Sequence, residues 1–331
     1  MISSKTKAFS DLNRLGYLNL PVPSKDKLIP EILRLKLKKK AVILAHYYQN
    51  EKIQELSDYL GDSLYLAQVA EKVKAPIIVF AGVHFMAETA KIINPEKKVL
   101  LPDLKAGCSL ADSCPPDEFK NFIKKNKNST VVSYINCSAE IKSLSDIVCT
   151  SSNAEKIINS IPKEKNIIFA PDRNLGQYLI KKTGRKMILW DGSCIVHEAF
   201  SFDKIIPLFK IHPNSKFIAH PESQSHILDI ANFIGSTSAL LHFVKNDDSK
   251  SYIVATEAGI LHEMKKKCPQ KTFIPAPVEN SSCSCSECAF MKLNTLEKLY
   301  LCLKYELPEI LINKKLISTA RKPIEKMLSL S

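Results

Sequence analysis

The cysteines are the first residues in this chain whose number and spacing suggest chemistry. There are ten in 331 residues, and the densest group is Cys283-Ser-Cys285-Ser-Glu-Cys288. The start of the chain lacks the layout of a signal peptide, so we expect a cytoplasmic protein. Structural disulfides are rare in that compartment, which favours metal binding or catalysis by the thiols. Taken alone, the group fits either a metal site or a redox pair.

Residues suited to proton transfer and anion binding recur at a fixed interval. Three pairs are each separated by 17 residues: His46 and Ser63, Tyr134 and Ser151, and His220 and Thr237. Histidine, tyrosine and carboxylate groups, here including Tyr48 and Glu222, can pass protons, and Tyr134 and Asn136 can donate hydrogen bonds to carboxylates. The hydroxyls stand where helices are expected to start, so they suit either helix capping or phosphate binding. Recurrence at matched positions favours a shared site over three unrelated structural residues.

The elements that carry these residues form three copies of one unit. Each begins with a β-rich run (41–46, 130–134 and 216–220) and continues with an amphipathic pattern that we predict to be a helix. The apolar positions of these patterns are Ile53, Leu56 and Leu60, then Ile141, Leu144, Ile147 and Val148, then Ile227, Ile230, Phe233 and Ile234. Each unit then predicts a strand, a helix and a strand: 77–81, 85–93 and 99–101; 167–170, 174–182 and 187–190; and 252–255, 260–267 and 272–274.

Strands that alternate with helices indicate an α/β fold with parallel sheets and right-handed crossovers. We expect three homologous three-layer αβα domains around a pseudo-threefold axis. Their predicted bounds are 1–112 with an N-terminal helical extension, 113–198 and 199–290, followed by a C-terminal helical segment, 291–331. That last segment predicts two helices split near Pro308 and a final helix after Pro323. Function gathers beyond the carboxyl ends of parallel strands, so this arrangement predicts one shared site.

One cysteine follows the last strand of each unit: Cys108, Cys194 and a member of the Cys283–Cys288 group. Three thiolates can hold three corners of a four-iron cluster, whereas an electron-transfer cluster usually has four cysteines. An open iron can act as a Lewis acid. A closed zinc site prefers four nitrogen or sulfur ligands, commonly in paired C-x2-C elements, and this chain has only one tight group.

The bulk composition is that of a soluble globular protein, with 45% hydrophobic and 24% charged residues. No apolar stretch is long enough for a membrane helix, so we expect no membrane partner. The formal net charge is +13, but the lysines are scattered and are not interleaved with aromatics as in single-strand binders. We therefore expect no nucleic acid. A basic, zinc-stabilised nucleic-acid-binding protein remains the alternative, and a third reading is a cluster protein that senses oxygen or carries electrons.

Many motifs in this chain are similar to those of the quinolinate synthase family, over residues 25–330. The earlier ones are Ala45-His-Tyr-Tyr-Gln49, Gly61-Asp-Ser-Leu64, Gly82-Val-His-Phe-Met-Ala-Glu-Thr-Ala-Lys91, Tyr134-Ile-Asn136 and Cys149-Thr-Ser-Ser-Asn153. The later ones are Pro171-Asp-Arg-Asn-Leu-Gly176, Trp190-Asp-Gly-Ser-Cys194-Ile-Val-His-Glu198, His220-Pro-Glu222, Gly235-Ser-Thr-Ser238 and Cys288-Ala-Phe-Met-Lys-Leu-Asn-Thr-Leu-Glu297. No single motif is specific, but together they are.

The resemblance implies a [4Fe-4S] cluster with three cysteine ligands and one open iron. Cys108, Cys194 and Cys288 match the ligands, while Cys283 and Cys285 are spare. Some family members have a C-x2-C-x2-C group where this chain has C-x-C-x2-C. A redox role for the extra thiols therefore does not carry over.

The resemblance also implies the reaction, in which iminoaspartate and dihydroxyacetone phosphate condense to quinolinate with loss of phosphate and water, in NAD biosynthesis. An enzyme that supplies iminoaspartate is then an expected partner. By resemblance, the proton-transfer residues are Tyr48, His220 and Glu222. The substrate-binding residues are His46, Ser63, Tyr134, Asn136, Ser151 and Thr237.

Overall fold

The computed structural model describes residues 12–279 and 286–331, so Cys283 and Cys285 lie outside the described residues. The described chain forms two compact units. One contains the chain up to Cys108 together with Ala289–Arg321, and the other contains Ser109–Cys288 together with Lys322–Ser331. The first unit holds one four-stranded sheet and the second holds two.

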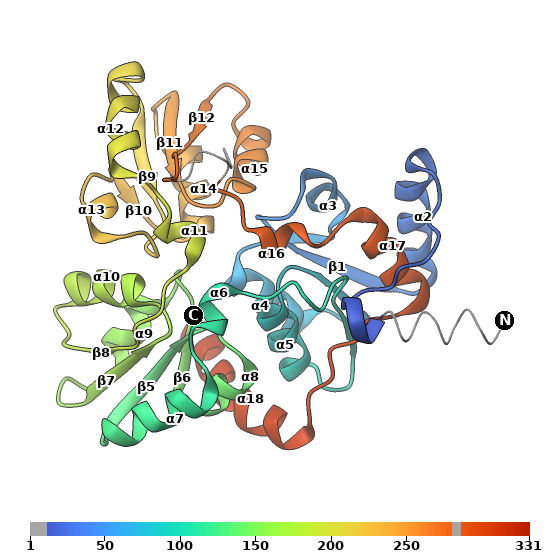
Figure 1. Cartoon of the computed structure of the whole chain (residues 1–331), viewed down its shortest axis with the longest axis horizontal. Coiled ribbons are helices and arrows are strands. Elements are labelled where there is room, and N and C mark those ends of the chain that lie inside the picture. Colours follow the sequence, from blue (N-terminus) through green and yellow to red (C-terminus); the bar gives the residue numbers. More distant parts are fainter. Residues whose placement is uncertain (1–11, 280–285) are drawn as a thin grey trace. The chain divides into compact units, whose positions relative to one another are not determined.

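All three sheets are parallel and share one strand order, which confirms the predicted α/β class and the three repeats (Figure 1). The first sheet has the order β2-β1-β3-β4, with β1 (Ala41–His46), β2 (Tyr59–Gly61), β3 (Ile77–Ala81) and β4 (Lys98–Leu100). The second has the order β6-β5-β7-β8, with β5 (Ser129–Tyr134), β6 (Ile147–Cys149), β7 (Asn166–Ala170) and β8 (Ile188–Leu189). The third has the order β10-β9-β11-β12, with β9 (Lys216–Ala219), β10 (Phe233–Ile234), β11 (Ser251–Ala255) and β12 (Thr272–Pro275).

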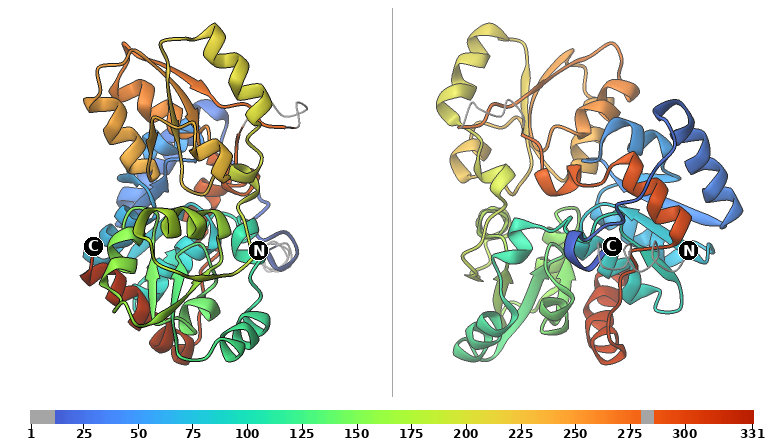
Figure 2. Two further views of the ribbon diagram at one scale, coloured as in Figure 1. Left: turned by 90° about the vertical axis from the view of Figure 1, so that its left-hand side faces the viewer. Right: turned by 45° about the vertical axis from the view of Figure 1, so that its right-hand side comes forward.

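Helices connect the strands and cover the sheets. In the first unit they are α2 (Lys25–Lys38), α3 (Glu51–Leu56), α4 (Ser63–Lys72), α5 (His84–Ile93), α16 (Ala289–Lys292) and α17 (Leu296–Tyr305). In the second they are α6 (Ser109–Asp112), α7 (Pro116–Lys125), α8 (Ala139–Ser143), α9 (Ala154–Ser160), α10 (Arg173–Thr183), α11 (Ile195–Glu198), α12 (Phe202–Ile211), α13 (Ser225–Leu228), α14 (Thr237–Asn246) and α15 (Ile260–Lys267). In the third repeat, Figure 1 and Figure 2 show α12 and α13 on one face of the sheet and α14 and α15 on the other.

The strand register explains the 17-residue interval. In the first repeat His46 pairs with Gly61, and in the second Tyr134 pairs with Cys149, an offset of 15 positions in both. The third repeat has the same offset, with Ala219 opposite Ile234. A residue 17 positions after the end of the first strand therefore lies two residues beyond the neighbouring strand, at the same carboxyl edge of the sheet.

The same side-chain contact fixes this register in every repeat. Asp58 Oδ2 accepts a hydrogen bond of 2.8 Å from the backbone N–H of Ile43, and Asp58 returns its own N–H to the Ile43 carbonyl at 2.9 Å. The same pair of bonds joins Asp146 to Val131 and Asn232 to Phe217. We call these three residues, Asp58, Asp146 and Asn232, the register clasps, because each closes a hydrogen-bonded ring between neighbouring strands.

The predicted amphipathic helix after each first strand is wrong in its extent. The structure has a short helix (α3, α8 or α13) followed by a short strand (β2, β6 or β10). Leu60, Ile147, Val148, Phe233 and Ile234 therefore lie in strands. An apolar run of two or three residues continues a helical period as easily as it forms a buried strand, so periodicity cannot separate the two.

The predicted break at Pro323 is also wrong, because α18 (Lys314–Ser329) runs through it. A proline removes one backbone N–H and crowds the preceding turn, which usually ends a helix. Here Ile317, Ala320, Ile324 and Met327 are buried along one helical stripe, so packing outweighs the local cost. Other predicted element bounds differ from the structure by one or two residues. The domain boundaries and the pseudo-threefold axis stay predictions.

Within the described ranges, no helix combines the length and apolar composition needed to cross a lipid bilayer.

Candidate active site

The second unit brings three of the expected site residues into direct contact. The Tyr134 hydroxyl, at the end of β5, donates a hydrogen bond to Glu222 Oε1, just beyond β9. His220 also follows β9, and its Nδ1 lies 3.7 Å from Glu222 Oε1. All three side chains are buried. Residues of the second and third repeats therefore form one buried cluster of ionisable groups, which we call the acid–base cluster, at the carboxyl ends of their sheets.

Electrostatics keeps Glu222 ionised inside this cluster. Burial alone raises the pKa of Glu222, but the imidazoles of His197 and His220, with hydrogen bonds from His197 and Tyr134, outweigh it and lower the pKa to about 2. Burial and the Glu222 charge raise the pKa of Tyr134 well above its ordinary value. The phenol therefore keeps its proton and donates a hydrogen bond to the ionised carboxylate, which fixes the orientation of both groups.

A second buried carboxyl, Asp172, accompanies Glu222. Burial and the Glu222 charge raise the pKa of Asp172 well above its ordinary value. Its Oδ1 caps α10 by accepting the Leu175 N–H at 2.7 Å, while Oδ2 is buried and has no hydrogen-bond partner among the described residues. Of these two carboxyls, Glu222 takes the negative charge and Asp172 stays protonated, because two buried like charges repel.

His220 connects the cluster to an expected hydroxyl. Its Nδ1 accepts the backbone N–H of Glu222 at 3.3 Å, and its Nε2 lies 3.2 Å from Ser151 Oγ. An N–H group can only donate, so in the neutral imidazole the proton sits on Nε2 and faces Ser151. His46 and Tyr48 repeat this turn in the first unit, where Tyr48 N–H donates to His46 Nδ1 at 3.2 Å.

The hydroxyls expected at helix starts are not the capping residues. Asp62 caps α4 and Ser236 caps α14, so Ser63 and Thr237 are the first helical residues. Ser151 lies in the turn before α9, whose N-cap position is Asn153. Of the two roles that the sequence left open for Ser63, Ser151 and Thr237, capping is therefore excluded, because other residues hold the N-cap positions.

Two further contacts place the remaining expected residues of the second unit. Ser152 Oγ donates to Ser236 Oγ at 2.8 Å, which brings the turn of Ser151 next to the start of α14, where Thr237 is buried. Asn136 Oδ1 is buried and has no hydrogen-bond partner in the described part of the protein. A buried amide oxygen without a partner is costly, so Asn136 suits a position that a bound molecule completes.

In the first unit the expected residues also lie together. The rings of His46 and Tyr48 are buried and meet edge to face, with centroids 4.3 Å apart. Lys292 Nζ donates to the Tyr48 carbonyl at 2.9 Å, and Gln49 Nε2 donates to the Met291 carbonyl at 3.0 Å, which hold this turn against α16. Ser63 follows Gly61, which pairs with His46 in the sheet.

The three cysteines expected to bind a cluster differ from the others in exposure. Cys108, Cys194 and Cys288 are partly exposed, whereas the five other described cysteines are buried. None of these eight thiols forms a disulfide. Burial raises the pKa of Cys114, Cys149 and Cys302. A metal is bound by the thiolate form of cysteine, so buried thiols with raised pKa values are poor ligands. The three partly exposed thiols suit an iron–sulfur cluster better.

Cys194 also belongs to a small group with two residues of the acid–base cluster. One ligand atom each from Cys194, His197 and Glu222 lies within 4.8 Å of the others, a set that can hold a metal ion. His197 Nδ1 is 3.3 Å from Cys194 Sγ and 3.2 Å from Glu222 Oε2. His197 was not among the site residues expected from the sequence, although its C-x2-H spacing from Cys194 was a signal.

A network behind the cluster joins the second and third repeats. Asn174 Nδ2 donates to Glu198 Oε2 at 2.7 Å and to the Glu222 carbonyl at 3.1 Å. Arg173 and Gln224 also donate to Glu198 Oε1, at 2.8 and 3.0 Å. The analysis of the sequence missed these supporting residues, because no periodicity marks them and their partners are distant in the chain.

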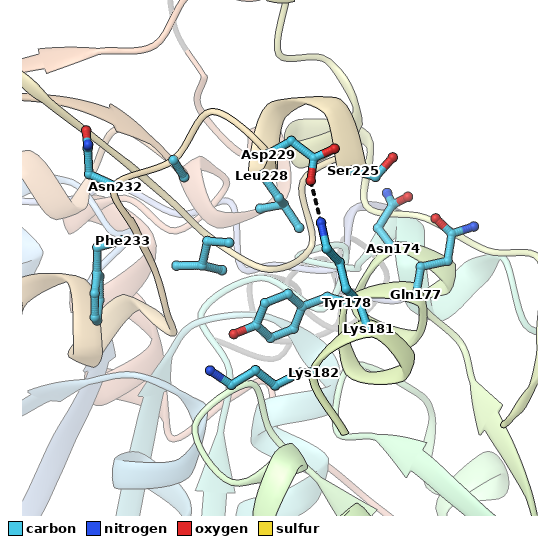
Figure 3. Close-up of a pocket in the computed structure, with 12 residues that line it drawn as sticks. Asn174, Gln177, Tyr178, Lys181, Lys182, Ser225, Leu228, Asp229, Asn232 and Phe233 are labelled. Carbon is cyan, nitrogen blue, oxygen red and sulfur yellow. Dashed lines mark hydrogen bonds and ion pairs between the residues drawn. The ribbon is translucent and has the colours of Figure 1, made fainter. Parts of the chain in front are cut away.

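A pocket of about 490 Å³ lies beyond this network in the second unit (Figure 3). Its lining residues come from α10 and the segment 225–234, and they include Asn174, Tyr178, Lys182, Leu228 and Phe233. Figure 3 shows the ion pair between Lys181 and Asp229 at the pocket, with Nζ and Oδ1 2.7 Å apart. Asn174 is its only contact with the network, and none of the expected site residues lines it. We therefore place the chemistry at the strand ends and not in this pocket.

The fold and site together define an α/β protein that carries an acid–base cluster and a partly exposed thiol at the carboxyl ends of parallel strands. The sequence profile of the quinolinate synthetase A protein family matches residues 30–329. The chain belongs to this family. This family membership does not favour the alternative of a zinc-stabilised nucleic-acid-binding protein.

Curated relatives are similar over nearly their whole length. The quinolinate synthase of Chloroherpeton thalassium is 59% identical over 304 residues, which cover 92% of this chain and 94% of the relative. That of a Synechococcus strain is 58% identical over 300 residues, covering 91% and 94%. That of Trichormus variabilis is 59% identical over 326 residues, covering 98% and 99%.

Proposed function

We propose that this protein is an enzyme that makes quinolinate for NAD biosynthesis, by condensing iminoaspartate with dihydroxyacetone phosphate. The observation that carries the proposal is the Tyr134–Glu222–His220 cluster, in which residues of two repeats meet beside Ser151 and His197. Membership of the quinolinate synthetase A protein family supports it. An enzyme that supplies iminoaspartate is a proposed partner.

The reaction removes protons from carbon and protonates leaving oxygens, so it needs groups that both accept and donate protons. Glu222 is the proposed base because it is an ionised carboxylate that lies between Tyr134 and His220 at the strand ends. Tyr134 holds its phenolic proton against Glu222 and orients the substrate. His220 carries a proton on Nε2 towards Ser151, and the Tyr48 phenol supplies a second acid from the first repeat.

The substrates carry carboxylates and a phosphate, which need hydrogen-bond donors. Ser63 and Thr237 are the first residues of α4 and α14, where backbone N–H groups lack helical partners and favour anions. Ser151, Asn136 and His46 add further polar groups in the two units. We propose that these five residues, with Tyr134, bind the substrate anions.

We propose a [4Fe-4S] cluster held by Cys108, Cys194 and Cys288, because these are the partly exposed thiols among the eight cysteines that the structure describes. When bound, the cluster supplies an open iron that acts as a Lewis acid towards the substrate. This requires the three domains, 1–112, 113–198 and 199–290, to surround one centre, with 291–331 packed on them.

The test is anaerobic purification, analysis of iron and sulfide, and an assay for quinolinate from iminoaspartate and dihydroxyacetone phosphate. We expect about four irons per chain, the number in a single [4Fe-4S] cluster, and quinolinate formation that needs both substrates. Zinc without sulfide would contradict the cofactor. An intact cluster without turnover would indicate a protein that senses oxygen or carries electrons.

A further inference from the structure

A buried carboxylate outside the acid–base cluster holds the segment of Cys288. Glu257 directly follows Thr256 at the carboxyl end of β11 and is completely buried. Its Oε1 accepts the backbone N–H of Cys288 at 3.0 Å, and its Oε2 accepts the N–H of Gly259 at 2.7 Å. The backbone N–H of Ala258 also donates to the Ser286 carbonyl at 3.0 Å. The loop after β11 therefore holds both Ser286 and Cys288, the two ends of the segment 286–288.

The residue before Glu257 reaches the surroundings of a second cysteine. Thr256 Oγ1 lies 3.1 Å from His197 Nε2, and His197 Nδ1 lies 3.3 Å from Cys194 Sγ. Thr256 and His197 are both buried. Two adjacent residues of one loop thus make two contacts near cysteines. Thr256 contacts His197, which lies next to Cys194, and Glu257 holds the backbone of Cys288.

We propose that the Thr256–Glu257 loop is a positioning element that aligns two of the three cluster cysteines, with Glu257 acting on Cys288 and Thr256 acting on Cys194 through His197. The proposal rests on the cluster of the proposed function. Neither residue binds iron. Their effect is to hold thiol-bearing segments in place before the metal arrives, as outer partners of metal ligands do.

The chemistry of Glu257 suits this role better than a neutral residue would. A carboxylate accepting backbone N–H groups forms charge-assisted bonds, which are about twice as strong as neutral ones. Cys288 is separated from β11 by a long connection that includes residues outside the described ranges, so the strand alone does not fix its position. The bond from the Cys288 N–H to Glu257 Oε1 supplies a direct constraint, and the bond from Gly259 holds the carboxylate in place.

The experiment compares Glu257→Ala with Glu263→Ala, which removes another buried carboxylate, on α15, that pairs with Lys267 at 3.4 Å. Hydrogen exchange is measured in the metal-free chain, and iron and sulfide are measured after anaerobic reconstitution. Losing a bond to a charged group costs enough to speed exchange of the Cys288 amide by about tenfold or more. We expect this in Glu257→Ala, together with reduced iron content and unchanged exchange in β11. Glu263→Ala should leave the Cys288 amide and the iron content unchanged.

A second pair of variants tests the other half of the loop. Thr256→Val keeps the side-chain shape and removes the hydroxyl, whereas Thr256→Ser keeps the hydroxyl. We expect Thr256→Val to lower the iron content without speeding exchange of the Cys288 amide. Thr256→Ser should have the iron content of the wild type. Unchanged Cys288 exchange in Glu257→Ala, or full iron content in either Glu257→Ala or Thr256→Val, would overturn the proposal. A wild-type chain that takes up no cluster would instead refute the proposed cofactor, and the exchange result would still report on the Glu257 bond.

Discussion

At the scale of single residues, the hydroxyls show how a sequence interval can mark a position in the fold while leaving its role open. The interval of 17 residues marks the carboxyl edge of each sheet, because neighbouring strands pair with an offset of 15. The neighbouring residues Asp62 and Ser236 do the capping. Helix capping and the proposed anion binding therefore belong to adjacent residues, so separate mutations can distinguish their effects.

Thr237→Ala and Ser236→Ala form a matched pair for this separation. Ser236 caps α14, so its loss should lower stability by about 0.5–2 kcal/mol. If Thr237 binds a substrate anion, its loss should cost about 1.5–3 kcal/mol of binding to a charged group, and so reduce kcat/KM by at least about tenfold, with the cluster retained. Thermal unfolding and anaerobic kinetics measure both effects. Unchanged kcat/KM in Thr237→Ala would remove this residue from the site.

Tyr48→Phe tests proton transfer from the first repeat. The ring packs edge to face on His46, and phenylalanine keeps that packing while it removes the hydroxyl. General acid–base groups contribute about 10²–10⁴-fold in rate, so we expect turnover to fall on that scale with iron content unchanged. Steady-state kinetics on the reconstituted enzyme measure it, and wild-type turnover would assign Tyr48 a structural role alone.

The sequence predicted Tyr134, His220 and Glu222, but not His197 or Glu257. The first three stand at or just after predicted strands, where parallel sheets place their functional groups. His197 and Glu257 act through contacts with residues far along the chain, such as Glu222 and Cys288. Such contacts depend on how separate segments pack, and the only local signal was the C-x2-H spacing of His197 from Cys194.

At the scale of elements, three strands of each repeat were predictable, and the short edge strand beside the first strand was not. Ile77–Ala81 is a continuous apolar run and was predicted with its correct bounds. The edge strands β2, β6 and β10 have two or three residues each, so their apolar positions extended the preceding helical pattern. The register clasps were the missed signal, because Asp or Asn precedes each edge strand and stops the helix.

Asn232→Ala tests whether the register clasps stabilise the sheet. Asn232 Oδ1 accepts the N–H of the buried residue Phe217 at 2.7 Å, and alanine leaves that donor without its partner. A buried unpaired group costs about 1–3 kcal/mol. We expect a lower midpoint of thermal unfolding and faster exchange of the Phe217 amide. Asn232→Asp places there the residue that serves at Asp58 and Asp146, so it should keep slow exchange, and equal exchange in both variants would contradict the role.

At the scale of the whole molecule, the repeats predicted three sheets, and the shared strand order confirms them. Four identically ordered parallel strands per repeat place His46, Tyr134 and His220 at or just after a carboxyl strand end, which the equal intervals already indicated. What the sequence could not provide is the packing between repeats, such as the bond from Tyr134 to Glu222. Side chains from separate repeats meet only after folding, so their pairing leaves no interval in the sequence.

Removing the cluster should loosen the whole chain, since its proposed ligands belong to three repeats. A group that binds only the native state stabilises it, by about 4 kcal/mol when present at a thousand times its dissociation constant. We therefore expect anaerobic chelation of iron to lower the midpoint of thermal unfolding in the wild type.

Cys108→Ser, Cys194→Ser and Cys288→Ser should each lose the stable four-iron cluster and activity, so chelation should not change their midpoints. Cys283→Ser should behave as the wild type, because Cys283 is spare in the three-ligand scheme. A full cluster in any of the first three variants, or its loss in Cys283→Ser, would contradict the ligand assignment.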